Sequence, residues 1–139
     1  LAASYLRLYE AEFWARFDAA VERHPGDPRS QLLDYFEGLA GRAVAPDYRG
    51  CGLSNATVEY PEPDHPARLG AERHKRELRS RLRGMAAAMG ASNPDLLGDS
   101  LMLLLEGALV SSQIFHAGGG PARALVAAAE RLIDSHLKS

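Results

Sequence analysis

Residues 94–116 carry more apolar surface than one side of a helix can bury, and this constrains the fold more than any other feature. On a helical wheel, only two narrow strips interrupt that surface: a polar one (Asp99, Glu106, Gln113) and one of small residues (Ser100, Gly107, Ser111). A helix within a single bundle normally buries one face. Because this one has about two faces to cover, we expect it to meet a second packing partner, with the small residues allowing close helix approach.

The rest of the chain is also helical in pattern. Apolar residues recur at three- and four-residue spacing, which is typical of amphipathic helices. This spacing predicts long helices over 4–22, 28–45, 66–89, 94–116 and from 121 onward, and the glycine-containing segment 49–60 predicts a short, irregular, buried one. The expected fold is therefore an all-α antiparallel bundle of about five long helices and one short helix.

Capping residues mark the expected helix ends. Three N-caps are predicted because an Asp or Asn stands just before a proline-led helix: Asp27, Asp64 and Asn93. Gly90 is a predicted C-cap. The glycines at 118–120 separate the last two helices.

Composition limits the class of protein. The chain has 139 residues, 46% of them hydrophobic, with a net charge of −2, which is typical of one globular domain. The longest nearly apolar run, 101–105, is too short to span a bilayer. Basic residues on 66–89 are interpreted as a solvated face in which Arg76 and Arg81 pair with Glu72 and Glu77. The single cysteine excludes an internal disulfide and favours a cytoplasmic location.

No motif for catalysis or metal binding stands out. The five histidines are scattered along the chain, without an i,i+4 pair: His24, His65, His74, His116 and His136. Because zinc needs three or four converging ligands, we expect no metal. No cofactor and no catalytic residue is predicted. Cys51 is interpreted first as a core residue, with pocket lining or redox sensing as alternatives.

The apolar excess of 94–116 predicts a two-fold homodimer in which the last two helices of each copy form a four-helix bundle. The predicted interface residues lie on these two helices: Leu101, Leu104, Leu105, Ala108, Ser111, Phe115, Ala122, Leu125, Ala129 and Leu132. The alternative is that both helices are simply central within one chain.

Several short motifs, in this order and spacing, resemble the C-terminal domains of TetR-family regulators. They are 47–51 (DYRGC), Asn55-Ala56, Glu59, 63–66 (PDHP), Gly90, Asn93-Pro94 and 106–109 (EGAL). The opening residues 1–17 resemble the helix that follows the DNA-binding module in that family. The resemblance covers nearly the whole chain.

The resemblance implies a helix-turn-helix module upstream of residue 1, which alone would contact operator DNA. It also implies dimerisation through the last two helices and a cavity among the earlier helices for a small, hydrophobic effector. Effector binding would shift the population of dimers away from the DNA-binding arrangement, as in a repressor. The alternative functions are a helical dimerisation or scaffold module without a ligand, and a small helical enzyme.

Within the implied cavity, the predicted ligand-binding residues combine aromatic side chains with a few polar ones: Phe13, Trp14, Phe17, Phe36, Cys51, Asn55 and Glu59. The aromatic residues are equally consistent with the core. Asn55 and Glu59 share one face of the short helix, where they serve either as polar anchors for a ligand or as ordinary helix-end hydrogen bonds.

Overall fold

The computed structural model describes residues 2–46, 48, 50–115 and 120–137, and within these ranges every regular element is a helix. The elements in chain order are α1 (Ala2–Arg23), α2 (Pro28–Ala43), α3 (Gly52–Glu59), α4 (Pro66–Ala88), α5 (Pro94–Phe115), a 3-10 turn η1 (Pro121–Ala124) and α6 (Leu125–Leu137). The predicted all-α fold is confirmed. No helix in the described ranges is both long and apolar enough to cross a membrane.

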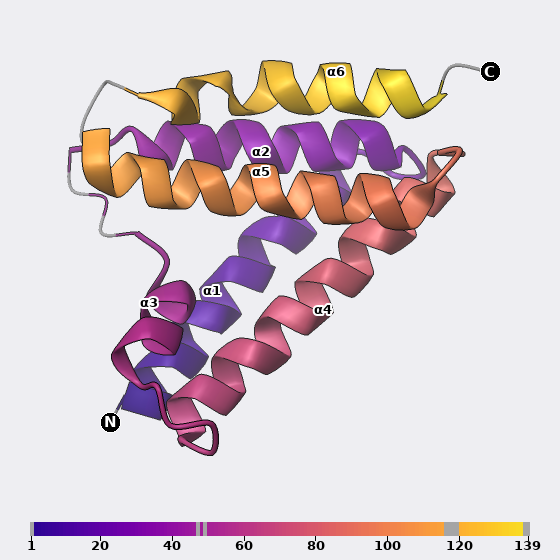
Figure 1. The fold of residues 1–139 in the computed structure, drawn as a ribbon. Coiled ribbons are helices and arrows are strands. Elements are labelled where there is room, and N and C mark those ends of the chain that lie inside the picture. The colour runs from indigo at the N-terminus through magenta and orange to yellow at the C-terminus, as the bar shows by residue number, and fades with distance from the viewer. Residues whose placement is uncertain (1, 47, 49, 116–119, 138–139) are drawn as a thin grey trace.

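The helices form two groups that meet at an angle. Helices α2, α5 and α6 run side by side in one layer, and each packs against the other two (Figure 1). Helices α1 and α4 descend from this layer and converge near α3 at the opposite end (Figure 1). This arrangement leaves space where α1 diverges from the layer, and it exposes one side of α5 and α6.

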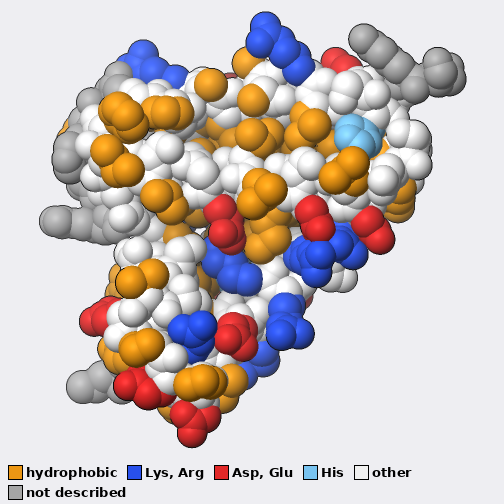
Figure 2. All heavy atoms as spheres, viewed as in Figure 1, with side chains coloured by type: hydrophobic (Ala, Val, Ile, Leu, Met, Phe, Trp, Pro, Cys, Tyr) orange, Lys and Arg blue, Asp and Glu red, His pale blue; other side chains and the backbone are white. Residues whose placement is uncertain are grey.

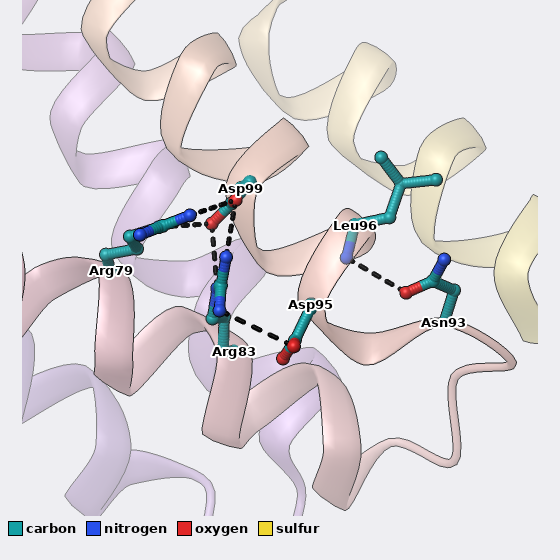
Figure 3. A network of polar contacts seen from close by, with 6 residues as sticks. All are labelled: Arg79, Arg83, Asn93, Asp95, Leu96 and Asp99. Atoms are coloured by element: carbon teal, nitrogen blue, oxygen red, sulfur yellow. Dashed lines mark hydrogen bonds and ion pairs between the residues drawn. The ribbon is translucent and has the colours of Figure 1, made fainter.

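Three of the predicted caps are confirmed. The side chain of Asp27 accepts a hydrogen bond from the Ser30 amide at 3.1 Å, and Asn93 accepts one from the Leu96 amide at 3.2 Å (the latter in Figure 3). Each satisfies an amide that the first turn of a helix leaves without a partner. Gly90 follows α4 with a φ of +84°, a conformation that suits glycine at a helix end.

Two predicted helix starts need correction. The N-cap of α4 is His65 and not Asp64, because His65 directly precedes the first helical residue and its Nδ1 accepts from the Ala67 amide at 3.1 Å. The His65 ring also stacks on Tyr60, with centroids 4.2 Å apart. The last helix does not begin as an α-helix at 121: η1 comes first, and α6 starts at Leu125. Residues 116–119, which include most of the predicted glycine break, lie outside the described ranges.

The polar strip predicted on 94–116 faces α4. Asp99 accepts two hydrogen bonds each from Arg79 and Arg83, at 2.7 to 2.9 Å (Figure 3). Farther along the same strip, Glu106 lies 3.1 Å from Nζ of Lys75. Three of the seven basic residues of α4 therefore join the two helices.

One of the two predicted ion pairs within α4 is present. Arg81 lies 3.3 Å from Glu77, as expected from their i,i+4 spacing. Glu72 pairs with Arg68 at 3.4 Å, and not with Arg76. Both arrangements keep the charges on one helix face, so the interpretation of α4 as a charged outer face changes only in its partners.

Close packing of leucines lies next to these ion pairs. The largest side chains buried where α4 meets α5 are Leu78, Leu82, Leu97, Leu101 and Leu105. Gly98 brings the two backbones together, because a Cβ atom built there would lie 2.7 Å from Cα of Arg83. This contact fixes α5 against α4 and determines which side of α5 is left uncovered.

Candidate functional site

A cavity of about 440 Å³ lies between α1, α2, α5 and the segment that joins α2 to α3. The residues that line it are mainly aromatic or charged: Tyr5, Tyr9, Glu12, Phe13, Arg16, Tyr35, Leu39, Arg42, Ala45, Tyr48, Gly50 and Leu109. Several of them are exposed at its mouth, so the cavity opens to solvent. Its volume lies within the usual range for small-molecule sites.

Helical periodicity places most of the lining. On α1, Tyr5, Tyr9 and Phe13 follow one another at four-residue spacing and therefore share one face. On α2, Tyr35 and Leu39 are related in the same way. Sequence reasoning assigned such stripes to the core, so the tyrosines and arginines of the cavity were missed. The signal available was three tyrosines and two arginines among the apolar residues of two adjacent helices, with a fourth tyrosine, Tyr48, in the segment that follows them.

The tyrosines of the cavity are strongly held in the neutral form. Burial raises the pKa of Tyr9, Tyr35 and Tyr48 above the ordinary value of 10.0, and Cys51 adds to the rise at each of them. Their hydroxyl groups therefore remain hydrogen-bond donors at neutral pH. The hydroxyl of Tyr48 is buried, and it has no hydrogen-bond partner among the described residues.

Of the predicted aromatic ligand residues, Phe13 lines the cavity and the other three do not. Trp14 is half-buried and packs beneath Arg81, whose guanidinium carbon lies 4.1 Å from the ring centroid. Phe17 and Phe36 are buried in the core. These three residues do not line the cavity because they lie on faces of α1 and α2 that turn away from it.

Cys51 is buried, with 2% of its surface exposed, and it caps the start of α3. Its sulfur accepts from the Ser54 amide at 3.5 Å and lies 3.7 Å from Nζ of Lys75. Burial tends to raise the pKa of this thiol, but Lys75 and Ser54 outweigh that effect and lower it. Cys51 thus lies behind the cavity wall, in the packing position that was its first interpretation.

Asn55 and Glu59 lie in a separate recess of about 270 Å³ on α3. Both side chains are exposed, and the recess shares Tyr5 and Gly50 with the larger cavity. The short helix therefore buries only its other side, at Leu53 and Ala56. The expectation that α3 is buried as a whole is corrected, because its polar face meets solvent and not the core.

A second candidate surface lies on the uncovered side of α5 and α6. The exposed apolar residues on α5 are Leu96, Leu103, Val110, Ile114 and Phe115, with 53% to 74% of their surface accessible. Hydrophobic side chains gather over this part of the molecule, whereas charged ones gather over α4 (Figure 2). The predicted excess of apolar surface on this helix is therefore present.

An apolar groove of about 280 Å³ runs between α5 and the η1–α6 segment. Its walls consist of small and aliphatic residues: Leu103, Leu104, Gly107, Ala108, Ser111, Pro121, Ala124, Leu125 and Ala128. Gly107 is exposed, and a Cβ atom built there would meet nothing within 4 Å. The small-residue strip is thus not filled by described side chains of the same chain.

Most of the predicted interface residues lie on the inner side of the two helices. Six of the ten are buried within the chain, at 6% exposure or less: Leu101, Leu105, Ala108, Ala122, Leu125 and Ala129. The remaining four reach the surface at least in part: Leu104, Ser111, Phe115 and Leu132. The correction follows from the α4 contacts, which turn Leu101 and Leu105 toward the core and Leu103 and Ile114 outward.

The histidines do not form a common site in the described part of the chain, and no group of three His, Cys, Asp or Glu there could hold a metal ion. His24 contacts Asp34 at 2.9 Å, His65 caps α4, and His74 is fully buried. His116 lies outside the described residues.

Solved structures provide the comparison that decides the family. A TetR-family transcriptional regulator from Streptomyces coelicolor superposes with a TM-score of 0.87 over 96% of this chain, at 22% sequence identity. A candidate TetR transcriptional regulator from Streptomyces avermitilis is 31% identical over 94% of this chain, with a TM-score of 0.71. The chain belongs to the TetR family. No family profile and no curated protein sequence matches it.

The present TetR-family chain spans 65% of the length of the S. coelicolor protein and 74% of the S. avermitilis protein. The resemblance stated from the sequence motifs is therefore confirmed at the level of family and fold.

Proposed function

We propose that this chain is the effector-binding and dimerisation domain of a TetR-type transcriptional repressor. A small molecule would bind in the 440 Å³ cavity, and a second copy would pack on the exposed side of α5 and α6. Operator DNA would be contacted only by a helix-turn-helix module upstream of residue 1. The family membership of the chain, its cavity and its exposed apolar surface support this proposal.

The observation that carries the proposal is the position of α5 between the two surfaces. Leu109 lines the cavity, and its neighbour Ala108 lines the groove on the other side of the same helix. A ligand that displaces this wall of the cavity also displaces one wall of the groove. Such a ligand prefers one arrangement of the dimer and shifts the population toward it.

The exposed side of α5 supports dimerisation on energetic grounds. Burying a leucine or isoleucine side chain is worth about 1.5–3 kcal/mol. Leu103 and Ile114 are 74% and 66% exposed, and Gly107 between them lets a second backbone approach closely. We therefore assign the interface to the outward residues of α5 and α6 and to the groove between these helices, in place of the four buried residues that do not line it: Leu101, Leu105, Ala122 and Ala129.

A thermal-shift screen of neutral and charged aromatic compounds tests the effector site. Binding to the folded state raises the melting temperature in a saturable way. The variant Ala45→Trp fills the cavity from its rim, so any stabilisation that arises there should disappear. The matched control is Ala87→Trp, which adds the same ring at an exposed position of α4.

Two results would contradict the effector proposal. One is that no compound in the screen stabilises the wild-type chain, which would favour the alternative of a dimerisation or scaffold module without a ligand. The other is that stabilisation persists unchanged in Ala45→Trp, which would place the binding site elsewhere.

A further inference from the structure

Two arginines, Arg16 and Arg42, line the cavity. In the described ranges five arginines are partly buried: Arg29, Arg42, Arg68, Arg81 and Arg83. Four of them lie within 3.5 Å of a carboxylate, and Arg42 alone has no ion-pair partner among the described residues. Among the partly buried arginines of the described ranges, Arg42 is therefore the one available to an anion from outside the chain.

The surroundings of Arg42 favour a flat anion with spread charge. Its guanidinium carbon lies 6.0 Å from the ring centroid of Tyr35, and both residues line the cavity. Arg16 reaches the cavity from α1, without an ion-pair partner among the described residues, and Glu12 is the acidic residue in the lining. Arg42 is in the last turn of α2, where its positive charge offsets the negative end of the helix dipole, and a singly charged anion is opposed less by that dipole than a doubly charged one.

Tyr48 supplies a second, independent indication that the ligand carries an oxygen atom. Its hydroxyl group is buried in the cavity wall and has no hydrogen-bond partner among the described residues. A buried donor of this kind is normally satisfied. Because Tyr48 lines the cavity, a small rotation of its side chain would bring this hydroxyl to an oxygen acceptor of a ligand, whereas a hydrocarbon would leave it without a partner.

We propose that the cavity binds a planar aromatic carboxylate, with its ring among the tyrosines and its carboxylate on Arg42 and Arg16. This inference rests on the proposed effector site. It narrows the chemical class of the effector, for which the family resemblance implied only a small, hydrophobic molecule. The planar guanidinium of arginine matches a carboxylate in shape and can donate two hydrogen bonds to it. Tyr48 then donates to an oxygen of the ligand.

A pair of probes that differ only in charge tests the inference. Calorimetric titration compares 6-hydroxy-2-naphthoate with its neutral amide on the wild-type chain. Because an arginine–carboxylate contact strengthens binding, the acid should bind about tenfold more tightly than the amide. Arg42→Met should remove that preference and leave the affinity for the amide unchanged.

Two further variants make the test specific. Arg76→Met removes an exposed arginine of α4 that has no ion pair in the described ranges, and it should behave as wild type. Arg16→Met alters an exposed side chain and should reduce the preference for the acid, even if Arg42→Met folds poorly. Circular dichroism verifies that each variant is folded.

Equal affinity for acid and amide would overturn the inference and leave the proposed effector site standing, because the cavity would still bind a small molecule. An acid preference that survives in both Arg42→Met and Arg16→Met would also overturn it. Failure of both probes to bind at millimolar concentration would do the same, and the wider compound screen would then decide the effector site separately.

Discussion

Nδ1 of His74 on α4 lies 3.1 Å from Oε2 of Glu10 on α1. The imidazole is fully buried, and its ring centroid lies 4.6 Å from that of Phe13, in an edge-to-face arrangement. This contact joins the two helices that converge toward α3. It also makes their packing dependent on the protonation state of one histidine.

Acid should destabilise the chain through His74. Burial, with a smaller effect from Lys75, lowers the pKa of His74 from 6.5 to about 4. The unfolded chain then binds the proton first, so this contribution to stability is complete above pH 6.5 and is lost as the pH falls toward 4. We expect it to amount to about 3 kcal/mol.

Urea unfolding of the wild type and His74→Asn at several pH values measures this effect. The variant is expected to be less stable at neutral pH, because it loses ring packing against Phe13. Its stability should nevertheless fall less between neutral pH and pH 4. Parallel pH profiles for the two proteins would show that His74 does not titrate in this range.

Asp99 should stabilise the junction of α4 and α5 only while it is ionised. Hydrogen bonds from Arg79 and Arg83 lower its pKa below the ordinary 3.8. Its contribution is therefore present above the unfolded value and is lost as the pH falls below that value toward the folded one. Asp99→Asn should lower the melting temperature at neutral pH, and this difference should shrink in acid.

The control for this prediction is Asp64→Asn, which neutralises an exposed carboxylate that makes no ion pair in the described ranges. It should leave the melting temperature nearly unchanged. If Asp99→Asn were equally silent at neutral pH, the two arginines would not be joining the helices through this residue.

Two glycine substitutions should change stability in opposite directions. Gly98→Ala places a Cβ atom 2.7 Å from Cα and N of Arg83, so the α4 and α5 backbones must separate. We expect a loss of about 1–3 kcal/mol in the free energy of unfolding. At Gly84 on α4 a Cβ atom meets nothing within 4 Å, and Gly84→Ala should stabilise by about 0.5–1 kcal/mol. Denaturant titration of both variants checks the sign of each change.

Dimerisation should depend on the outward side of α5. Leu103→Glu puts a charge in the middle of the apolar groove, and sedimentation equilibrium at micromolar concentration should then show monomers where the wild type shows dimers. Leu8→Glu alters a residue that is 61% exposed on α1, and it should leave the dimer intact. A wild-type chain that sediments only as a monomer would refute the proposed interface.

Most of the helical framework follows from local signals. Asp27 and Asn93 cap helices as predicted, because the same short-range geometry that makes them good caps in general operates here. Asp64 failed as a cap by one position, because His65 can accept the same hydrogen bond from directly before Pro66. Local sequence therefore defines where a helix lies better than it defines its first residue.

The main error of the sequence-based prediction concerned the orientation of α5, that is, which of its sides faces the core, and the error has a physical cause. Two arcs of this helix are equally apolar, so hydrophobicity could not determine which one faces the core. The polar strip could have done so: Asp99 and Glu106 meet basic residues of α4, and this fixes the rotation of the helix. The side of α5 that faces the core is thus determined by ion pairs between residues far apart in the sequence, and not by the distribution of apolar residues around the helix.

Most residues that line the candidate cavity were missed for a different reason, although the family resemblance implied a cavity among the earlier helices. A stripe such as Tyr5, Tyr9 and Phe13 has the same pattern whether it fills a core or lines a hollow. Only the divergence of α1 from the α2–α5–α6 layer leaves the space open, and that angle depends on contacts far apart in the sequence. Phe13, a predicted ligand-binding residue, belongs to both the core and the cavity wall.

Ala108 and Leu109 are consecutive, yet they face different hollows. Because an α-helix moves largely as a rigid unit, a shift of α5 at the cavity also shifts it at the groove. A ligand large enough to displace α5 would therefore change the surface that α5 presents to a second copy, without a hinge or a relay of side chains. Under the proposed function, ligand binding and dimerisation both depend on the position of this one helix.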